Sequence, residues 1–465
     1  MSAVNAGPRL DRLPVSAFHR RVFVLVAIGM FFDGFDIYIA GTVLGTTLHT
    51  GFSTMGQNAS FVSMTFVGMM LGSFFTGFLG DRFGRRFTYQ ANLALFGLAS
   101  LAAAFAPNMT VLIGLRFLMG IGLGAENVVG YATLTEFAPA RDRGRWLGFL
   151  AVVVVTGLPI AVLISTVMIP AFGWRSMFVL GGIGALVVWY IRKSLPESPR
   201  WLESVGRFAE AETLLRRIEA EAAPGLNPPL PKPPMPESPV LASAAAPPSR
   251  ALSTLFAPPL LARMVLGCIA LIVINTLIYG FITWLPAFFV KQGLSIATSF
   301  NFTLIMSLGA PVGATIGALT ADRWGRKPTL VGAAALAIIF GAIYPFIHDP
   351  ALLPIVGLAL TIPIYVLVAL LFGIYIPELF PTEVRLRAAG ICNTFGRGAT
   401  ILTPFIVVSL FTNYGIVGVL AMMIGLLAVL IVTVLGLGIE PRQRSLEELA
   451  SQPDELPDPA SAAAR

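Results

Sequence analysis

The heptapeptide GDRFGRR at residues 80–86 returns as ADRWGRK at residues 321–327, 241 positions further along the chain. A second pair of segments keeps this spacing to within one residue: TEFAPARDRGR at 135–145 and PELFPTEVRLR at 377–387. Paired glycines repeat in the same register, Gly68 and Gly72 in the first copy and Gly309 and Gly313 in the second. Matches that share one register indicate an internal duplication, so the sequence predicts two homologous halves.

The composition indicates a membrane protein. Of the 465 residues, 56% are hydrophobic and only 12% are charged, whereas soluble domains carry about 25% charged residues. About twelve apolar runs approach the roughly 20 residues with which a helix crosses a bilayer. They lie near residues 20–46, 57–79, 87–105, 110–138, 145–168, 174–192, 262–290, 297–320, 329–347, 351–378, 388–411 and 415–438. Helices around a large soluble core would need polar faces, which these runs lack. We therefore predict an all-α polytopic membrane protein with twelve transmembrane helices in two pseudo-symmetric six-helix halves.

The net charge of +7 reflects topology. Arginines and lysines gather before the first run and after every even-numbered run, and the loops between hold few cations, Lys291 among them. Cytoplasmic loops of membrane proteins are enriched in Lys and Arg. Both termini and the central linker are therefore expected in the cytoplasm, with the protein in a plasma membrane of the bacterial inner-membrane type. The basic residues carry no argument for nucleic-acid binding.

The segments outside the apolar runs divide the chain further. Residues 205–222, VGRFAEAETLLRRIEAEA, have a helix-forming, charge-rich composition and predict a short cytoplasmic helix. Residues 222–250 contain ten prolines and predict an extended connector. The expected organisation is a cytoplasmic segment (1–19), a six-helix half (20–192), a linker (193–261), a second six-helix half (262–438) and a cytoplasmic tail (439–465).

Two six-helix halves, a cytoplasmic linker and the repeated GDRFGRR and ADRWGRK loops resemble the major facilitator superfamily, over residues from about 20 to 444. PESPRWL at 196–202 resembles the sugar-porter branch, whereas FFDGFDIYIAG at 31–41 resembles aromatic-acid/proton symporters and FITWLP at 281–286 resembles organic-acid carriers. Sugar porters carry paired glutamines in the seventh span, where this chain has Asn275 as its only amide. The resemblance implies alternating access around a site between the halves of a monomer.

Two carboxylates, Asp33 and Asp36, lie inside the first apolar run. At ~1.5 Å per residue they lie ~18 and ~22 Å from the cytoplasmic edge, and Arg116 in the fourth run falls at a depth similar to that of Asp36. Ionisable residues within a span are functional candidates, so we expect Asp33, Asp36 and Arg116 to couple protons to conformation. Glu126, nearer the cytoplasmic edge, is a second relay carboxylate or the partner of a cation on another helix. The alternative is a static ion pair that only fixes packing.

Arg397 lies near mid-membrane in the eleventh run, and no acidic residue of the second half lies at that depth. A deep arginine without a partner suits a substrate carboxylate, to which a guanidinium can donate two parallel hydrogen bonds. A structural arginine bonded to main-chain oxygens is the alternative. The side chains expected to line a binding cavity with Arg397 are Tyr38, Asn275, Tyr279, Trp284 and Tyr365. Each of these is also a plausible packing residue.

The repeated loops predict a conformational latch. Asp81 and Asp322 open the two basic loops, where a carboxylate can cap a neighbouring helix and bond the loop arginines. The family resemblance implies that such groups latch the halves together on the inner side in one state. The remaining candidates are Arg85, Arg86, Glu136 and Arg143 in the first copy, and Arg326, Glu378 and Arg385 in the second.

The sequence therefore predicts a secondary active transporter that takes up a small organic anion, such as an aromatic or other carboxylic acid, together with protons. A proton-coupled sugar or polyol symporter is the alternative. A polytopic membrane enzyme is disfavoured, because the chain offers no nucleophile–base constellation and no metal-ligand set. No cofactor or metal is expected. The expected partners are the substrate, protons and the lipid bilayer.

Overall fold

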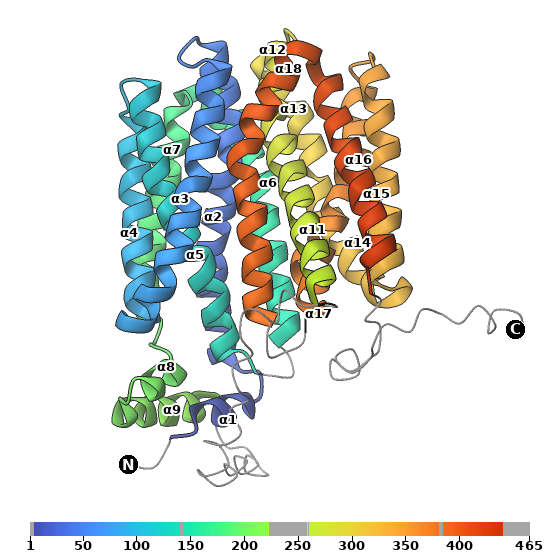
Figure 1. The fold of residues 1–465 in the computed structure, drawn as a ribbon. Helices are drawn as coiled ribbons and strands as arrows, with labels where there is room; N and C mark the ends of the chain where they lie inside the picture. The colour runs from blue at the N-terminus through green and yellow to red at the C-terminus, as the bar shows by residue number, and fades with distance from the viewer. Residues whose placement is uncertain (1–3, 140–142, 223–257, 259, 381–384, 440–465) are drawn as a thin grey trace, which may run out of the picture.

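The computed structural model describes residues 4–139, 143–222, 258, 260–380 and 385–439. Long, roughly parallel helices form a bundle, and three short helices lie together at one end of it (Figure 1). We call this the α8/α9 end. No strand occurs in the described ranges. The proline-rich segment and nearly all of the predicted tail lie outside them.

The first half contains six long helices. They are α2 (Ala17–His49), α3 (Met55–Phe83), α4 (Arg85–Ala104), α5 (Met109–Phe137), α6 (Arg143–Phe172) and α7 (Arg175–Ile191), followed by the 3₁₀ turn η1 (Arg192–Ser194). A capping box between Thr54 and Gln57 begins α3.

The second half repeats this plan with more broken helices. Its elements are α11 (Leu260–Gly280), η3 (Ile282–Trp284), α12 (Leu285–Lys291), α13 (Ile296–Ser307), α14 (Gly309–Trp324), α15 (Arg326–Ile343), η4 (Tyr344–Phe346), α16 (Leu352–Leu370), the π-helical turn η5 (Leu371–Tyr375), α17 (Ile376–Glu378) and α18 (Arg385–Leu437). The last helix contains a break at Gly415, where φ is 64° and ψ is −157°. It therefore accounts for the two predicted runs at 388–411 and 415–438.

Ten segments of the described chain are long and apolar enough to cross a membrane. One of them, Ala388–Leu437, contains the break at Gly415 and supplies two spans. Helix α4, which runs alongside α5 and α7, completes the set. The arrangement is the predicted one of twelve transmembrane helices.

The repeated loops have the same backbone conformation in both halves. Gly84 separates α3 from α4 with φ 91°, and Gly325 separates α14 from α15 with φ 95°. A side chain rarely adopts such positive φ values, which explains why glycine stands at this position of both GDRFGRR and ADRWGRK.

Small residues let equivalent helices approach closely in both halves. Gly72 of α3 packs on the Ile121 carbonyl of α5, and Gly313 of α14 packs on the Ile362 carbonyl of α16; a Cβ at either glycine would collide with the oxygen. The pseudo-symmetry that the sequence predicts is thus present in the packing, since α3–α5 and α14–α16 are corresponding pairs.

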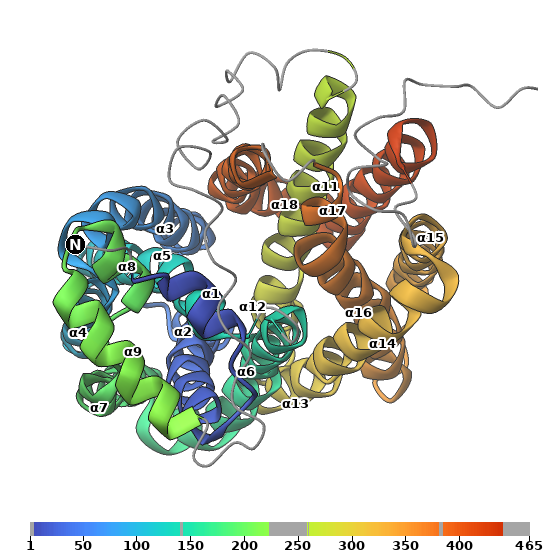
Figure 2. The same ribbon diagram turned by 90° about the horizontal axis from the view of Figure 1, so that it is seen from below.

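The halves meet at mid-bundle and toward the end opposite α8 and α9. A Cβ added at Gly41 would lie 2.5 Å from the Thr283 oxygen, so α2 and η3 are in close contact there. At mid-bundle the hydroxyl groups of Tyr38 and Tyr365 are 3.3 Å apart. Seen from the α8/α9 end, the first-half helices gather on one side and the second-half helices on the other (Figure 2).

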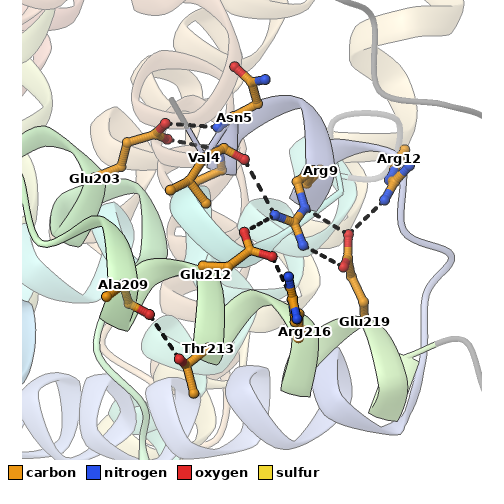
Figure 3. A network of polar contacts seen from close by, with 11 residues as sticks. Val4, Asn5, Arg9, Arg12, Glu203, Ala209, Glu212, Thr213, Arg216 and Glu219 are labelled. Atoms are coloured by element: carbon orange, nitrogen blue, oxygen red, sulfur yellow. Dashed lines mark hydrogen bonds and ion pairs between the residues drawn. The ribbon is translucent and has the colours of Figure 1, made fainter. Parts of the chain in front are cut away.

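A small helical cap covers the α8/α9 end of the first half. It consists of α1 (Ala6–Asp11), α8 (Pro199–Ser204) and α9 (Phe208–Ala222), and α9 lies inside the stretch where the sequence predicts a short helix. Arg9 donates hydrogen bonds to Glu212 (2.5 Å) and Glu219 (2.7 Å), and Arg12 donates to Glu219 (2.7 Å) (Figure 3). The N-terminal helix is thereby attached to the segment that follows α7.

Candidate functional site

Asp36 and Arg116 form a fully buried ion pair between α2 and α5. Arg116 donates from Nη1 to the Asp36 carboxylate and from Nη2 to the Asp36 main-chain oxygen at 3.1 Å. Its Nε donates to Thr65 Oγ1 at 3.0 Å. The two side chains are 0% and 1% exposed. The pairing expected from the depths of Asp36 and Arg116 is present, while its role in proton coupling stays a prediction.

A second buried ion pair joins Glu126 of α5 to Arg192, the first residue after α7. Arg192 also donates to the carbonyl oxygens of Leu25 at 2.7 Å and Val26 at 2.8 Å, both on α2. Its guanidinium lies 4.7 Å from the ring centre of Tyr89. Three helices therefore meet at Arg192.

Sequence reasoning missed the role of Arg192, because it stands among the basic residues that mark topology after the sixth run. Its position directly at the end of that run, rather than several residues beyond it, was the available signal. Of the two alternatives for Glu126, a relay carboxylate or the partner of a cation on another helix, the structure shows an ion pair with this arginine, and a relay role stays a prediction.

Asp33 lies on α2 between the two ion pairs and is 3% exposed. It makes no hydrogen bond or ion pair with any other residue of the described chain, and its Oδ2 atom is buried without a partner. Glu126, Arg192 and Asp36 are charged groups in its neighbourhood. Asp33 is thus a buried carboxyl group close to other charges but bonded to none of them.

A small cavity lies between the two halves beside the Asp36–Arg116 pair. Thr65, Phe66 and Arg116 line it from the first half, and Tyr279 and Thr283 line it from the second. The rings of Phe66 and Tyr279 meet edge to face, with centres 4.4 Å apart. We call this space the central cavity.

Arg397 of α18 is half-buried next to the central cavity. Its guanidinium lies beside the Tyr279 hydroxyl and reaches Met69 Sδ of the first half at 3.8 Å. No carboxylate of the described residues pairs with Arg397. The arginine therefore presents a positive charge at the junction of the two halves.

The structure separates the other predicted lining residues into two groups. Tyr38 and Tyr365 contact each other across the halves at mid-bundle. Asn275 donates its amide to Leu271 of its own helix at 2.7 Å. Trp284 stacks on Phe288 within the second half. Of the predicted lining residues, Tyr279 lines the central cavity. Tyr38, Asn275, Trp284, Tyr365 and Arg397 are not among the residues that line it.

The predicted latch residues form equivalent ion pairs in the two halves. Arg85 pairs with Glu136 at 3.0 Å, and Arg326 pairs with Glu378 at 3.0 Å. Each of these pairs lies within one half, so in this conformation neither links the halves. The side chains of Asp81, Arg143, Asp322 and Arg385 lie outside the described residues.

Glu197 of the PESPRWL segment is a further member of the first-half loop that the sequence did not single out. Its carboxylate accepts from the main-chain N–H groups of Arg85 at 2.9 Å and Arg86 at 3.2 Å, at the start of α4. The Arg86 side chain donates to the Lys193 oxygen at 2.9 Å. A carboxylate at a helix N-terminus is stabilised by the unpaired N–H groups and by the helix dipole.

Comparison with known proteins agrees with this architecture. Residues 26–377 match the model of the Major Facilitator Superfamily. The chain is 38% identical over 452 residues to the inner membrane metabolite transport protein YdjE of Escherichia coli (strain K12), covering 96% of this chain and 98% of that protein. It is 33% identical over 450 residues to the niacin transporter NiaP of Acinetobacter baylyi, covering 95% and 98%.

Among solved structures, the fold is similar to a partially occluded inward open conformation of the xylose transporter XylE from E. coli. The TM-score is 0.71 at 18% identity, and the match covers 92% of this chain and 100% of that one. A likeness at this level of identity concerns the fold.

Proposed function

The chain belongs to the Major Facilitator Superfamily, and on this premise we propose that it takes up a small aromatic carboxylate together with protons. Its family and its relatives are transporters of metabolites rather than enzymes, and the protein is an integral membrane transporter. The proposal concerns the substrate, the coupling ion and the direction of transport.

The observation that carries the proposal is the position of Arg397. A half-buried guanidinium without a carboxylate partner among the described residues stands at the junction of the halves. A substrate carboxylate would supply that partner and could accept two parallel hydrogen bonds. Tyr279, directly beside Arg397, and Phe66 offer ring edges and faces to an aromatic substrate.

The niacin transporter among the relatives supports this substrate class, since niacin is an aromatic ring that bears one carboxylate. A sugar would need several hydrogen-bonding groups around its hydroxyls. The only amide of the seventh span, Asn275, donates to its own helix instead. We therefore place the sugar or polyol symporter second.

Proton coupling is supported by the placement of the buried carboxylates. Arg116 lines the central cavity and holds Asp36, so a substrate that enters the cavity changes the surroundings of the pair. Burial favours the protonated form of a carboxyl group, whereas a nearby guanidinium favours the ionised form. A movement that changes the surroundings of a buried carboxyl group in this part of the first half would couple proton binding to the conformation of the carrier.

The orientation of the carrier in the membrane is part of the same proposal. We place both termini and the helical cap in the cytoplasm of a bacterial cell, because the cations of the sequence gather on that side. The contacts of Gly41 with Thr283 then lie toward the outer side of the membrane. Rocking of one half against the other would open the outer side and let the latch loops of a monomer meet on the inner side.

The experiment is uptake into proteoliposomes with an imposed pH gradient, alkaline inside. Labelled nicotinate, benzoate and xylose are offered separately, with a proton ionophore as control. We expect nicotinate or benzoate to accumulate, and the ionophore to abolish the accumulation. Accumulation of xylose alone would favour the sugar symporter. Carboxylate uptake that does not depend on the imposed pH gradient would refute proton coupling.

A further inference from the structure

The membrane-embedded core of the first half contains more buried acids than buried bases. In the described chain its buried carboxylates are Asp33, Asp36 and Glu126, and its buried guanidiniums are Arg116 and Arg192. Two carboxylates have their own arginine, since Asp36 pairs with Arg116 and Glu126 pairs with Arg192. Asp33 is the remaining carboxylate, the one without an arginine partner among the described residues, and we call it the odd carboxylate.

An unpaired ionised carboxylate in an apolar interior is expensive, and such a group neutralises itself by binding a proton. We propose that Asp33 carries the transported proton, and that the Glu126–Arg192 pair is a positioning pair that keeps Asp33 without a counterion. The proposal rests on the proton-coupled function above and names the residue that holds the proton. Asp36 and Arg116 then form the pair that senses the substrate in the central cavity.

The position of Asp33 relative to the second pair follows from contacts between α2 and α5. Gly130 of α5 packs on Met30 of α2, where a Cβ would lie 2.5 Å from the sulfur atom. Glu126 lies one turn from Gly130 on α5, and Asp33 lies one turn from Met30 on α2. Because the two helices run in opposite directions, both carboxyl groups lie on the same side of the Met30–Gly130 contact.

The guanidinium of Arg192 is fixed by hydrogen bonds and by the space that Gly29 leaves on α2. Its Nη2 occupies the space in which a Cβ of residue 29 would stand, so only glycine at this position admits the guanidinium. Two main-chain oxygens of α2 and the Glu126 carboxylate accept from its nitrogens. With these bonds satisfied, Arg192 stays with Glu126 although Asp33 is near.

The remaining groups around Asp33 provide no other counterion in the described structure. Helix α6 contributes Val154, whose oxygen would lie 2.5 Å from a Cβ at Gly34. Tyr89 of α4 donates its hydroxyl to the Val129 oxygen at 2.9 Å. Of the other buried titratable groups of α2, Asp36 is paired with Arg116, Tyr38 contacts Tyr365, and His19 lies ~21 Å earlier along the helix axis. The proposal therefore requires that water reaches Asp33 when the halves move, so that its proton can exchange.

The test changes the number of buried carboxylates relative to buried arginines in the first half. Glu126→Gln leaves Arg192 without its carboxylate, so Asp33 becomes its counterion and stays ionised. The two remaining buried carboxylates, Asp33 and Asp36, then balance the two buried arginines, and no proton is needed. One proton per substrate gives about tenfold accumulation for each unit of pH gradient. We expect the wild type to approach this ratio with nicotinate, and Glu126→Gln to lose it. The double variant Glu126→Gln/Arg192→Gln restores an odd carboxylate, so it should regain accumulation although it lacks two charged groups.

The matched control is an exposed ion pair of the cap. Arg207 and Glu210 are 50% and 57% exposed, and both Glu210→Gln and Glu210→Gln/Arg207→Gln should accumulate nicotinate as the wild type does. Exchange of nicotinate at equal pH reports folded carrier in every variant. Glu126→Asp keeps the charge and should keep accumulation.

Infrared difference spectroscopy of the substrate-free protein gives an independent reading, even if a charge variant folds poorly. A carbonyl band of a protonated carboxyl group should titrate in the wild type and in Glu126→Asp, and should be absent from Asp33→Asn. A band that persists in Asp33→Asn overturns the proposal. So does accumulation by Glu126→Gln, or a folded double variant that exchanges but fails to accumulate. A wild type that exchanges nicotinate without accumulating it along the pH gradient would instead overturn the proposed function itself.

Discussion

Asp36 and Arg116 stand 80 residues apart in the chain, and in the folded protein Arg116 bonds both the carboxylate and the main-chain oxygen of Asp36. Double contact of this kind fixes the register between α2 and α5. It also places a charged pair directly beside the central cavity.

The first prediction concerns this pair. Asp36→Asn leaves a buried guanidinium uncompensated, and the loss of one partner of a buried pair costs ~3–5 kcal/mol. We expect a lower midpoint of thermal unfolding in detergent, and loss of pH-driven nicotinate accumulation in proteoliposomes. Asp36→Asn/Arg116→Gln should regain part of the stability. If Asp36→Asn is as stable as the wild type and still accumulates nicotinate, the pair has neither role.

The second prediction concerns Arg397. Arg397→Lys keeps the charge but cannot make the planar two-bond contact with a carboxylate. Because a hydrogen bond to a charged group contributes ~1.5–3 kcal/mol, we expect nicotinate to bind roughly 10-fold or more weakly by calorimetry. Nicotinamide, which has the ring without the charge, is the control ligand and should lose much less. Equal losses for the two ligands would indicate a structural arginine.

The third prediction concerns the latch. Glu136→Gln removes the carboxylate that pairs with Arg85, and Glu378→Gln removes the equivalent partner of Arg326. These partly exposed pairs are each worth ~1 kcal/mol or less, so turnover should fall only a few-fold in either variant, with substrate affinity unchanged. Initial rates and equilibrium binding are measured side by side. An affinity loss at constant turnover would place these residues in the binding site instead.

The fourth prediction concerns the helical cap and pH. Hydrogen bonds from Arg9 and then Arg216 hold the pKa of Glu212 below its ordinary value of 4.5. A carboxyl group with a depressed folded-state pKa stabilises the fold above its unfolded pKa, and this contribution is lost as pH falls through the folded pKa. We therefore expect α1 to detach from α9 only in acid, below pH 4.5.

The measurement for the cap is the mobility of a spin label at position 8, introduced as Pro8→Cys after replacement of Cys268 and Cys392 by serine. Mobility should rise as the pH falls, and Glu212→Gln should show raised mobility already at pH 7. A label whose mobility is the same at pH 7 and in acid would contradict the docking of α1 by these ion pairs.

The fifth prediction concerns orientation. A cysteine at Ser243, in the proline-rich segment, should react with a membrane-impermeant maleimide only after the cells are opened, because this segment is expected in the cytoplasm. A cysteine at Gln292, beside Lys291 on the opposite end of the bundle, should react in intact cells. The reverse pattern would invert the proposed topology.

The helices, their division into two halves and the matching depths of Asp36 and Arg116 could all be predicted from the sequence. Each of these properties depends only on the order of residues along the chain. They follow from the length of the apolar runs, from the internal repeat and from a count of residues from the membrane edge. The depth of Asp36 matched that of Arg116 because both follow from the rise of 1.5 Å per residue. The same counting could not reveal how a break at Gly415 joins two runs within α18.

The partners of the buried charges became known from the folded structure. Arg192 reaches Glu126 because Gly29 leaves space for its guanidinium on a third helix, and no sequence period encodes that space. The latch glutamates pair with Arg85 and Arg326 inside their own halves, which loop composition alone did not specify. Asn275 and Trp284 had suitable chemistry for a binding site, but side-chain packing directs them to partners within the second half. Pairing depends on distances between helices, and those are set by the packing of the whole bundle.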